Sequence, residues 1–171
     1  MATEFKAIDP TELTDNVFKI MDSDWMLVTA GTMGSFNTMT ASWGAMGILW
    51  GKRIAVCFIR PVRYTYEFIE RHSVFTLSFY DEGFRDALNL CGSMSGRDGD
   101  KAKAAGLTPV AASNGSVCFG EARLVLECRK IYTHDLDPKR FLDPAIEGNY
   151  PKKDYHRMFV GEITACLRRE A

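Results

Sequence analysis

Apolar and polar residues alternate over several stretches of the chain, and this pattern predicts β-strands. At residues 73–80, three apolar side chains fall on one face, and Thr76 and Ser78 fall on the other. This stretch is therefore predicted to form a half-buried strand. Further strands are predicted at 53–59, an apolar run that indicates burial on both faces, and at 121–133 and 158–167.

The stretch 121–133 is the longest strand candidate. Leu124 and Leu126 point to one face, whereas Glu127 and Arg129 point mainly to the other. This alternation predicts an apolar face packed on the core and a polar face that carries Glu127.

Helical spacing is clearest at 82–91, where apolar residues recur at i, i+3, i+4 and i+7. A short amphipathic helix is predicted to start at Asp9–Glu12 and to run on through Ile20, because a proline and acids mark its first turn. Two more helices are predicted at 62–71 and 100–105. The polar segment 135–154 contains three prolines and is predicted to be a surface excursion.

The order of these elements does not alternate regularly between strand and helix, which disfavours a doubly wound parallel sheet. The sequence therefore predicts a mainly β fold, an antiparallel barrel with a few peripheral helices. The chain has no repeat and no long linker, and 171 residues suit one domain spanning 1–171.

Charge and composition narrow the function classes. The net charge is -1 and the charged fraction is 25%, as in ordinary globular proteins. A role on nucleic acids or membrane surfaces normally needs a basic face, so neither is expected. Residues 1–9 lack the apolar core of a signal peptide, and no apolar run approaches the ~20 residues of a membrane span. A cytoplasmic protein is expected.

The five cysteines are scattered and form no CxxC pair. They are expected to be free thiols in a reducing compartment, and no metal site is predicted. Cys91 closes the apolar stripe of the helix at 82–91, so it is interpreted as a buried structural thiol. His156 is interpreted as a surface or interface residue.

Three segments carry candidate binding chemistry. The first combines small hydroxyl residues, an amide and a methionine around a predicted chain reversal. Its backbone amides and short side chains suit the polar edge of a flat ligand, although a glycine-rich hairpin with polar turn residues is the alternative. The candidates are Asn37, Thr38, Met39, Thr40, Ala41 and Ser42.

The second segment follows the strand at 53–59 and opens a helix. A helix N-terminus offers free N–H groups, and arginine adds a bidentate fork, so Arg63, Tyr64 and Thr65 are predicted to hold a phosphate. An ordinary solvated helix start is the alternative. Arg60 either reaches the phosphate and the part of the ligand next to it, or marks the solvent-exposed end of the strand.

The third segment is a basic loop after the helix at 82–91. Gly96 permits a tight turn and Lys101 supplies a point positive charge, so Ser95, Gly96 and Lys101 are candidates for contacts with a phosphate. A solvated loop whose acids balance its bases is the alternative. The three segments together suggest a phosphorylated aromatic cofactor.

In their order and spacing, these segments resemble the flavin reductase-like, FMN-binding split-barrel family, in its flavoredoxin-like branch. The resemblance covers residues 24–107, including Leu90–Lys101, with a further match at Phe159–Ile163. It implies a split β-barrel and an FMN-binding homodimer with each flavin near the subunit boundary. Trp43 and Trp50 are then expected to pack in the core or at that boundary rather than on the flavin.

The resemblance implies an NAD(P)H-dependent flavin oxidoreductase in which hydride passes to flavin N5. The flavin supplies the chemistry, so no catalytic side chain is predicted. The chain has no GxGxxG motif, and nicotinamide would bind on the flavin face. The first alternative is a flavoredoxin-like electron carrier that serves protein redox partners without oxidising NAD(P)H itself. The second is a binding module for another ligand.

Overall fold

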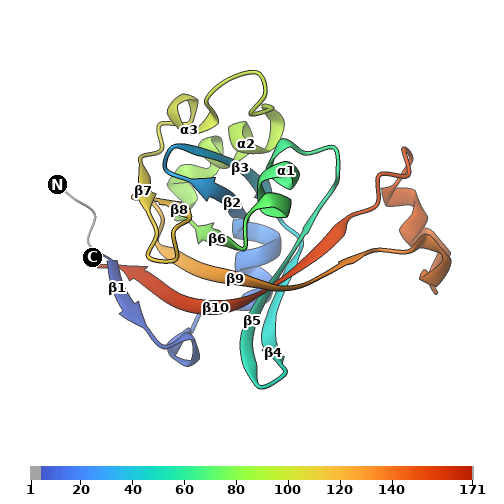
Figure 1. Cartoon of the computed structure of the whole chain (residues 1–171), viewed down its shortest axis with the longest axis horizontal. Coiled ribbons are helices and arrows are strands. Elements are labelled where there is room, and N and C mark those ends of the chain that lie inside the picture. Colours follow the sequence, from blue (N-terminus) through green and yellow to red (C-terminus); the bar gives the residue numbers. More distant parts are fainter. Residues whose placement is uncertain (1–4, 171) are drawn as a thin grey trace.

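One antiparallel sheet organises the molecule. The computed structural model describes residues 5–170, so part of the segment 1–9 considered for a signal peptide lies outside the described residues. The strands follow the order β3-β2-β6-β9-β10-β5-β4, and β1 also pairs with β10 (Figure 1). Their bounds are β1 Phe5–Ile8, β2 Met26–Thr32, β3 Ser35–Ala41, β4 Gly44–Leu49, β5 Lys52–Ile59, β6 Val74–Phe79, β9 Leu124–Asp135 and β10 Arg157–Arg169.

Strand β10 is the centre of the sheet because it pairs with three other strands. Its first half pairs with β5 from Arg157 to Glu162, and its last residues pair with β1. It pairs with β9 along most of its length, with register shifts at Val160/Gly161 and Ile163/Ala165. Such irregularities bend a strand and increase its twist. The sheet is open and does not close into a complete barrel, as in a split barrel, and β3 and β4 are the two ends of its strand order.

A second, two-stranded sheet covers one face of β6. It consists of β7 (Pro109–Ala111) and β8 (Val117–Phe119). Thr76 in β6 donates a hydrogen bond to the carbonyl of Val117, and both Thr76 and Ser78 are fully buried. The prediction of a half-buried strand at 73–80 is therefore wrong, because sequence alternation does not reveal a second layer on the polar side.

Glu127 is also fully buried, which contradicts its prediction on a polar outer face. Its carboxylate accepts hydrogen bonds from the Ser113 amide at 3.0 Å, the Ser113 hydroxyl at 2.6 Å and the Asn114 amide at 2.9 Å. These donors come from the β7–β8 turn, which folds over this part of β9. Strand β10 has 13 residues and β9 has 12, so β9 is not the longest strand.

The helices lie mostly on one side of the barrel. They are α1 (Tyr64–Arg71), the 3₁₀ turn η3 (Glu82–Phe84), α2 (Arg85–Ser93) and α3 (Lys101–Ala104), close to the three predicted helices. The helix predicted from Asp9 to Ile20 is wrong. A 3₁₀ turn, η1 (Pro10–Glu12), ends in extended backbone at Leu13, and Asn16 then starts a separate π-helix, η2 (Lys19–Asp24), by accepting a hydrogen bond from the Ile20 amide.

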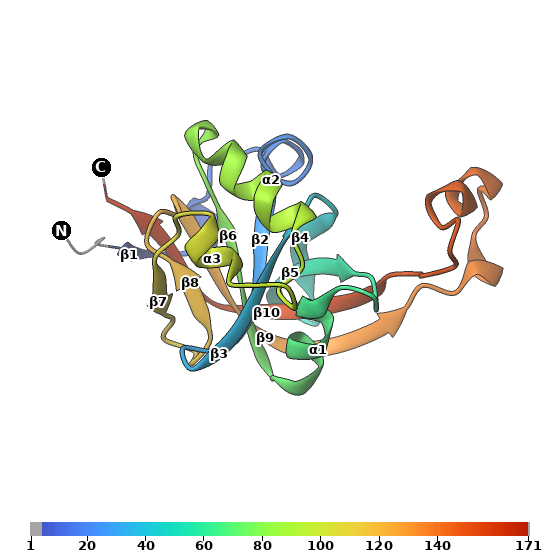
Figure 2. The same cartoon turned by 90° about the horizontal axis from the view of Figure 1, so that it is seen from above.

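An arm, residues 136–156, joins the ends of β9 and β10 and extends away from the barrel (Figures 1 and 2). It contains two 3₁₀ helices, η4 (Pro138–Arg140) and η5 (Pro144–Asn149), and most of its residues are at least partly exposed. The predicted surface excursion at 135–154 is confirmed, although Tyr150 at its base is buried.

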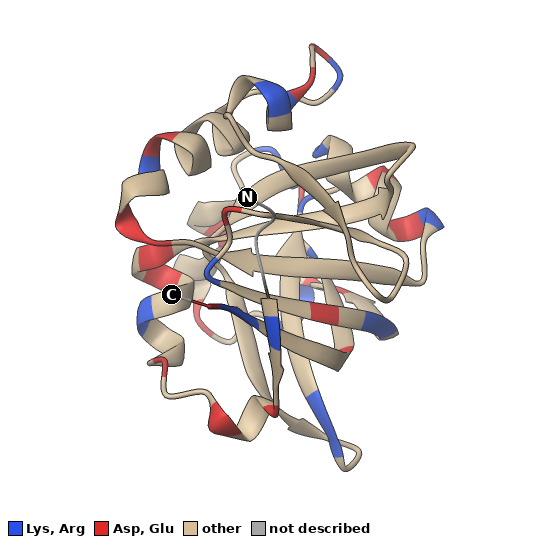
Figure 3. Ribbon diagram, turned by 90° about the vertical axis from the view of Figure 1, so that its left-hand side faces the viewer, with Lys and Arg blue, Asp and Glu red and all other residues tan. Residues whose placement is uncertain are grey.

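All five cysteines are free, as predicted, and all five are buried, although burial was predicted only for Cys91. None of the helices within residues 5–170 is long and apolar enough to cross a membrane. Lysines and arginines are interspersed with acids over the face seen in Figure 3. Over the described range, no group of three or more His, Cys, Asp or Glu side chains is arranged to hold a metal ion.

Candidate functional site

The first candidate segment lies on the edge strand β3 and not in the chain reversal itself. The reversal falls earlier, between β2 and β3, so the predicted hairpin-turn position is wrong. Because neighbouring side chains of a strand point to opposite faces, the side chains of this segment contact different parts of the molecule. The Thr38 hydroxyl meets Thr29 of β2 at 2.9 Å, whereas the Asn37 amide donates to the Thr65 hydroxyl in α1 at 2.7 Å.

Lys101 joins three elements at this edge. Its ammonium group donates to the carbonyl of Thr38 in β3 and to the carbonyl of Cys91 in α2, both at 2.9 Å. Lys101 is only 5% exposed and makes no ion pair with the carboxylates of the described residues. Burial, followed by repulsion from Arg63, lowers the pKa of Lys101 to about 8. A buried cation without a carboxylate partner is a favourable position for an anionic ligand.

Arg63 supplies a second cation beside Lys101. It is the N-cap residue of α1, and its guanidinium donates to the carbonyl of Gly92 in α2 at 2.8 Å. Burial and the neighbouring Arg60 lower the pKa of Arg63, which remains charged at neutral pH. No side chain caps the N-terminus of α1. The first turn of this helix therefore presents N–H groups and the positive end of its dipole near two cations.

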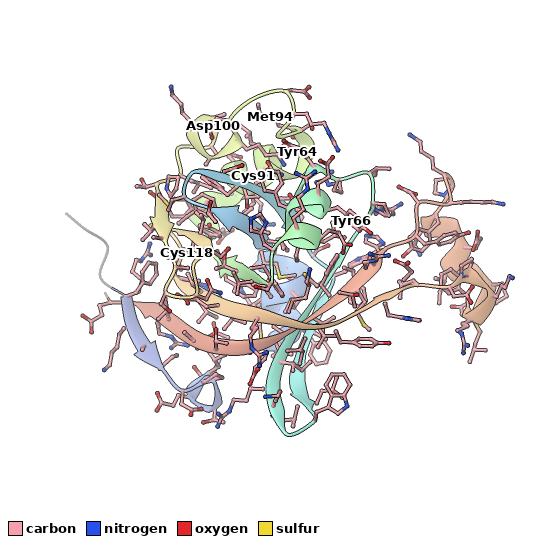
Figure 4. The ribbon with its side chains drawn as sticks, viewed as in Figure 1. Tyr64, Tyr66, Cys91, Met94, Asp100 and Cys118 are labelled. Atoms are coloured by element: carbon pink, nitrogen blue, oxygen red, sulfur yellow. The ribbon has the colours of Figure 1, made fainter. Side chains whose placement is uncertain are left out.

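Gly96 brings the third segment against the other two. A Cβ atom at this position would lie 1.9 Å from the Asn37 amide oxygen and 3.0 Å from the Tyr64 ring. The Ser95 hydroxyl accepts a hydrogen bond from the Arg97 amide, and the Arg97 guanidinium lies over the Tyr64 ring at 4.7 Å. In Figure 4, Tyr64, Cys91, Met94 and Asp100 gather where α1, α2 and α3 meet above β3.

Two small cavities share Lys101 in their walls. One, of about 90 Å³, has walls from all three segments: Met39, Val62, Arg63, Tyr64, Thr65, Ser93, Met94, Ser95, Gly96 and Lys101. The other, of about 250 Å³, is lined by residues that include Asn37, Thr38, Gly96, Gly99 and Lys101. The structure therefore brings together nine of the thirteen predicted site residues around two cavities, and we call this region the cation site.

The other four predicted residues lie outside the cation site. The Thr40 hydroxyl donates to the carbonyl of Leu88 in α2, and Ala41 packs in the core. Ser42 lines a separate, larger groove. Arg60 binds the arm: its guanidinium meets Asp154 at 2.7 Å and the carbonyl of Asn149 at 2.8 Å.

The arm adds residues that sequence reasoning did not connect with the site. Arg60 also lies over the Tyr150 ring at 4.9 Å, and the Tyr150 hydroxyl is hydrogen-bonded to His156 at 2.9 Å. His156 packs on Trp43 with ring centroids 4.9 Å apart. His156 is buried within the chain, which contradicts the surface part of its interpretation as a surface or interface residue. Burial, and then Arg60, lower its pKa to about 4.

Other contacts of the cation site left no signal in the sequence. The carbonyls of Thr38, Cys91 and Gly92 are backbone groups, so any side chain could have stood there. Cys91 is buried, as interpreted, and burial raises the pKa of its thiol to about 11. The thiol is protonated at neutral pH and is not an activated nucleophile. Trp50 is exposed at the β4–β5 turn and contacts the Tyr132 ring.

The chain belongs to a known family. The sequence pattern of the family described as "Flavin reductase like domain" matches residues 18–171. The fold and the family therefore agree with the resemblance drawn from the three segments. No curated protein sequence gives a match.

Solved structures share this fold. An FMN-binding domain of a flavin reductases-like enzyme from Shewanella baltica is 18% identical with a TM-score of 0.70, over 98% of this chain and 78% of its own. An FMN-binding protein from Thermus thermophilus is 20% identical with a TM-score of 0.70, over 97% and 83%. Flavoredoxin from Methanosarcina acetivorans is 23% identical with a TM-score of 0.68, over 95% and 77%.

The close approach of Gly96 to Asn37 gives a test of the cation site. We expect Gly96→Ala to lower the free energy of unfolding by about 2 kcal/mol, because the added methyl overlaps a buried, hydrogen-bonded amide. Urea unfolding followed by fluorescence measures this change. The control is Gly99→Ala, whose methyl meets only the flexible end of Met94 at 2.9 Å. Equal losses in the two variants would contradict the packing described here.

Proposed function

We propose that the protein binds FMN and acts as an NAD(P)H-dependent flavin oxidoreductase. The observation that carries this proposal is the cation site, where the buried, unpaired Lys101 ammonium and the Arg63 guanidinium flank the uncapped start of α1. Membership of the flavin reductase-like family, and structural neighbours described as FMN-binding, support the choice of ligand.

The donor set of the cation site fits the phosphate of FMN. Lys101 uses two of its three N–H donors on carbonyls and keeps one. Arg63 keeps donors beyond the one bound to Gly92. The hydroxyls of Thr65 and Ser95 and the first amides of α1 add neutral donors around the cavity of about 90 Å³. This cavity suits a phosphate group, and the predicted residues of β3 and Ser42 would hold the rest of the cofactor.

The chain's own residues would bind and orient the cofactor. When bound, FMN supplies the capacity to accept hydride from a nicotinamide. Backbone groups near Met39 and Ala41 and the hydroxyls of Thr40 and Ser42 are proposed to meet the polar edge of the ring. The hydrogen bond from Thr40 to the Leu88 carbonyl fixes that side chain before a ligand arrives.

A flavoredoxin-like electron carrier is the second candidate. Its support is the fold shared with flavoredoxin from Methanosarcina acetivorans. In that case the bound FMN would exchange electrons with a protein partner, and NAD(P)H would not reduce it.

Mixing experiments separate these functions. We expect FMN to bind saturably and its visible absorbance to bleach rapidly after anaerobic stopped-flow mixing with NADH or NADPH. Free FMN with the same nucleotide is the control. Bound flavin that only dithionite reduces would favour the carrier. A protein that stays colourless after incubation with FMN would refute the proposed function.

The protonation of Lys101 predicts a pH dependence of FMN affinity. The FMN phosphate is mainly a dianion above about pH 7. The pKa of Lys101 is about 8, so the ammonium is charged at pH 7 and neutral well above pH 8. We expect FMN affinity to fall by about tenfold as the pH rises from about 7 to about 9.5.

Flavin fluorescence titrations at constant ionic strength measure this dependence. Lys101→Met is expected to bind FMN weakly with little change over the same pH range. Lys103→Met removes an exposed lysine of the same helix and is expected to behave like the wild type. A pH dependence that survives in Lys101→Met would show that another group is responsible.

We also propose a homodimer in the cytoplasm. Exposed apolar side chains at the β4–β5 turn, Ile48, Leu49 and Trp50, lie near the exposed Tyr132 and support a subunit contact there. The five free thiols suit a reducing compartment. Light scattering should give twice the mass of one chain, and Trp50→Lys should weaken the dimer. A monomer at micromolar concentration would contradict the dimer.

A further inference from the structure

Two backbone carbonyls hold the amino group of Lys101 in a fixed orientation. Its Nζ atom lies 2.9 Å from the carbonyl oxygen of Thr38 and 2.9 Å from that of Cys91. Nζ is tetrahedral, so its bond to Cε and two N–H groups take three of its directions. The remaining direction holds the third N–H of the ammonium form or the lone pair of the neutral amine. Loss of one proton therefore costs neither hydrogen bond and leaves a lone pair that points away from both carbonyls.

The amino group can be reached from the cavities of the cation site. Lys101 is only 5% exposed, but it is part of the walls of both cavities, of about 90 Å³ and about 250 Å³. Asp100 lines the larger one, and its carboxylate accepts a hydrogen bond from the Lys103 amide. None of the carboxylates in residues 5–170 forms an ion pair with Lys101. The amine is therefore open to a small molecule and is not engaged by an acid.

The surroundings of Lys101 favour its neutral form. Burial, and then repulsion from Arg63, lower the pKa of Lys101 to about 8, and the weaker influence of the Cys91 thiol opposes them. Asn37 and Thr38, the β3 residues at this wall, carry no charge. An ordinary lysine has a pKa of about 10.4, so at about pH 7.5 the neutral fraction of Lys101 is on the order of a hundredfold larger. A neutral lysine is a nucleophile toward carbonyl compounds.

Lys130 provides a comparison within the same chain. Its ammonium group also donates to two carbonyls, those of Ile69 at 2.6 Å and Glu70 at 3.1 Å. Burial lowers the pKa of Lys130 as well, but the Glu70 carboxylate favours its charged form. Its nitrogen lies 6.0 Å from the centre of the Phe159 ring, outside the cation site. Carbonyl contacts are thus shared by both lysines, whereas the neighbouring cation and the two cavities distinguish Lys101.

Groups that can bind an anion lie beside this amine. The smaller cavity is also lined by Arg63, Thr65 and Ser95. The Thr65 hydroxyl accepts a hydrogen bond from the Asn37 amide at 2.7 Å, and the Ser95 hydroxyl accepts one from the Arg97 amide at 3.2 Å. Because both hydroxyls act as acceptors in these bonds, each keeps its own proton for donation. The wall therefore combines a nucleophile with donors that suit a phosphate.

We propose that Lys101 binds short phosphorylated aldehydes covalently, as an imine, while Arg63, Thr65 and Ser95 hold the phosphate. The nitrogen forms a bond to the aldehyde carbon, and the carbonyl oxygen leaves as water with two hydrogens of the ammonium group. The product is a protonated imine, and nothing is oxidised or reduced. It keeps one N–H, which either of the two backbone carbonyls can accept, and hydrolysis reverses the step.

The adduct and the FMN phosphate would occupy the same cavity, so the aldehyde would regulate how much flavin the protein holds. Only this competition rests on the proposed function. Formation of the imine needs the amine and the anion-binding groups and no flavin.

The probe is D-glyceraldehyde 3-phosphate, incubated with the full-length protein and sodium cyanoborohydride, which reduces imines to stable amines. Peptide mass spectrometry then gives the rate of modification of each lysine. We expect Lys101 to react at least about tenfold faster than Lys130 and the exposed Lys103. Unphosphorylated D-glyceraldehyde should react with Lys101 at least about tenfold more slowly than the phosphorylated probe. Saturating FMN should slow the reaction at Lys101 and leave that at Lys103 unchanged.

A variant of the anion-binding wall tests the role of the phosphate. Arg63→Leu should abolish most of the preference for the phosphorylated aldehyde, measured as the ratio of the two rates at Lys101. This ratio does not depend on how nucleophilic the amine is, because both aldehydes meet the same amine. The matched control is Arg71→Leu, which removes an exposed arginine from the last turn of the same helix and should keep the wild-type ratio.

Different results would overturn different parts of the inference. Modification of Lys101 no faster than that of Lys103 would refute the covalent site. Equal rates with the two aldehydes, or an unchanged ratio in Arg63→Leu, would refute the phosphorylated ligand. Bound FMN that does not slow the reaction would refute the competition. Selective modification of a protein that binds no FMN would refute the proposed function and leave this inference standing, and FMN binding with unselective modification would do the reverse.

Discussion

The buried ammonium group of Lys101 determines how the candidate site is built. It bonds to carbonyls of β3 and α2 from the start of α3, and so ties an edge strand to two helices. Charge buried in this way is unfavourable unless it is compensated. Two carbonyl dipoles compensate it in part, and the neighbouring Arg63 works against it. The residual positive potential is the physical reason why this small region suits an anion.

The motif at residues 60–65 serves two parts of the molecule. Arg63 turns toward α2, whereas Arg60 turns toward the arm, although the two are only three residues apart. Arg60 follows the last residue of β5, and Arg63 is the N-cap residue of α1 after the intervening turn, and their side chains bind different parts of the molecule. The same short sequence therefore links the cation site to the arm.

Local patterns predicted the type and order of the elements correctly wherever no distant segment covers the polar face of an element. Helices α1 and α2 and strands β5 and β10 follow from apolar spacing. The errors share one cause, which is contact with a distant segment. Thr76, Ser78 and Glu127 are buried because the β7–β8 hairpin covers polar faces that sequence alternation assigns to solvent. The helix predicted near the N-terminus is too long, because the backbone is extended at Leu13 and a second helical segment starts after Asn16.

The amino-acid sequence by itself determined the fold class, the family resemblance and the three segments that carry binding chemistry, because these depend on residue types, spacing and order. Only the tertiary structure decided which of those residues meet. Nine of them, including Lys101, line the two cavities of the cation site, whereas Arg60 holds the arm and Ser42 lines the larger groove. The direction of a side chain at the end of a strand or helix depends on the groups that it contacts. Lys101 contacts backbone carbonyls, and Arg60 contacts an arm some 90 residues away in the sequence. No local sequence pattern encodes such contacts.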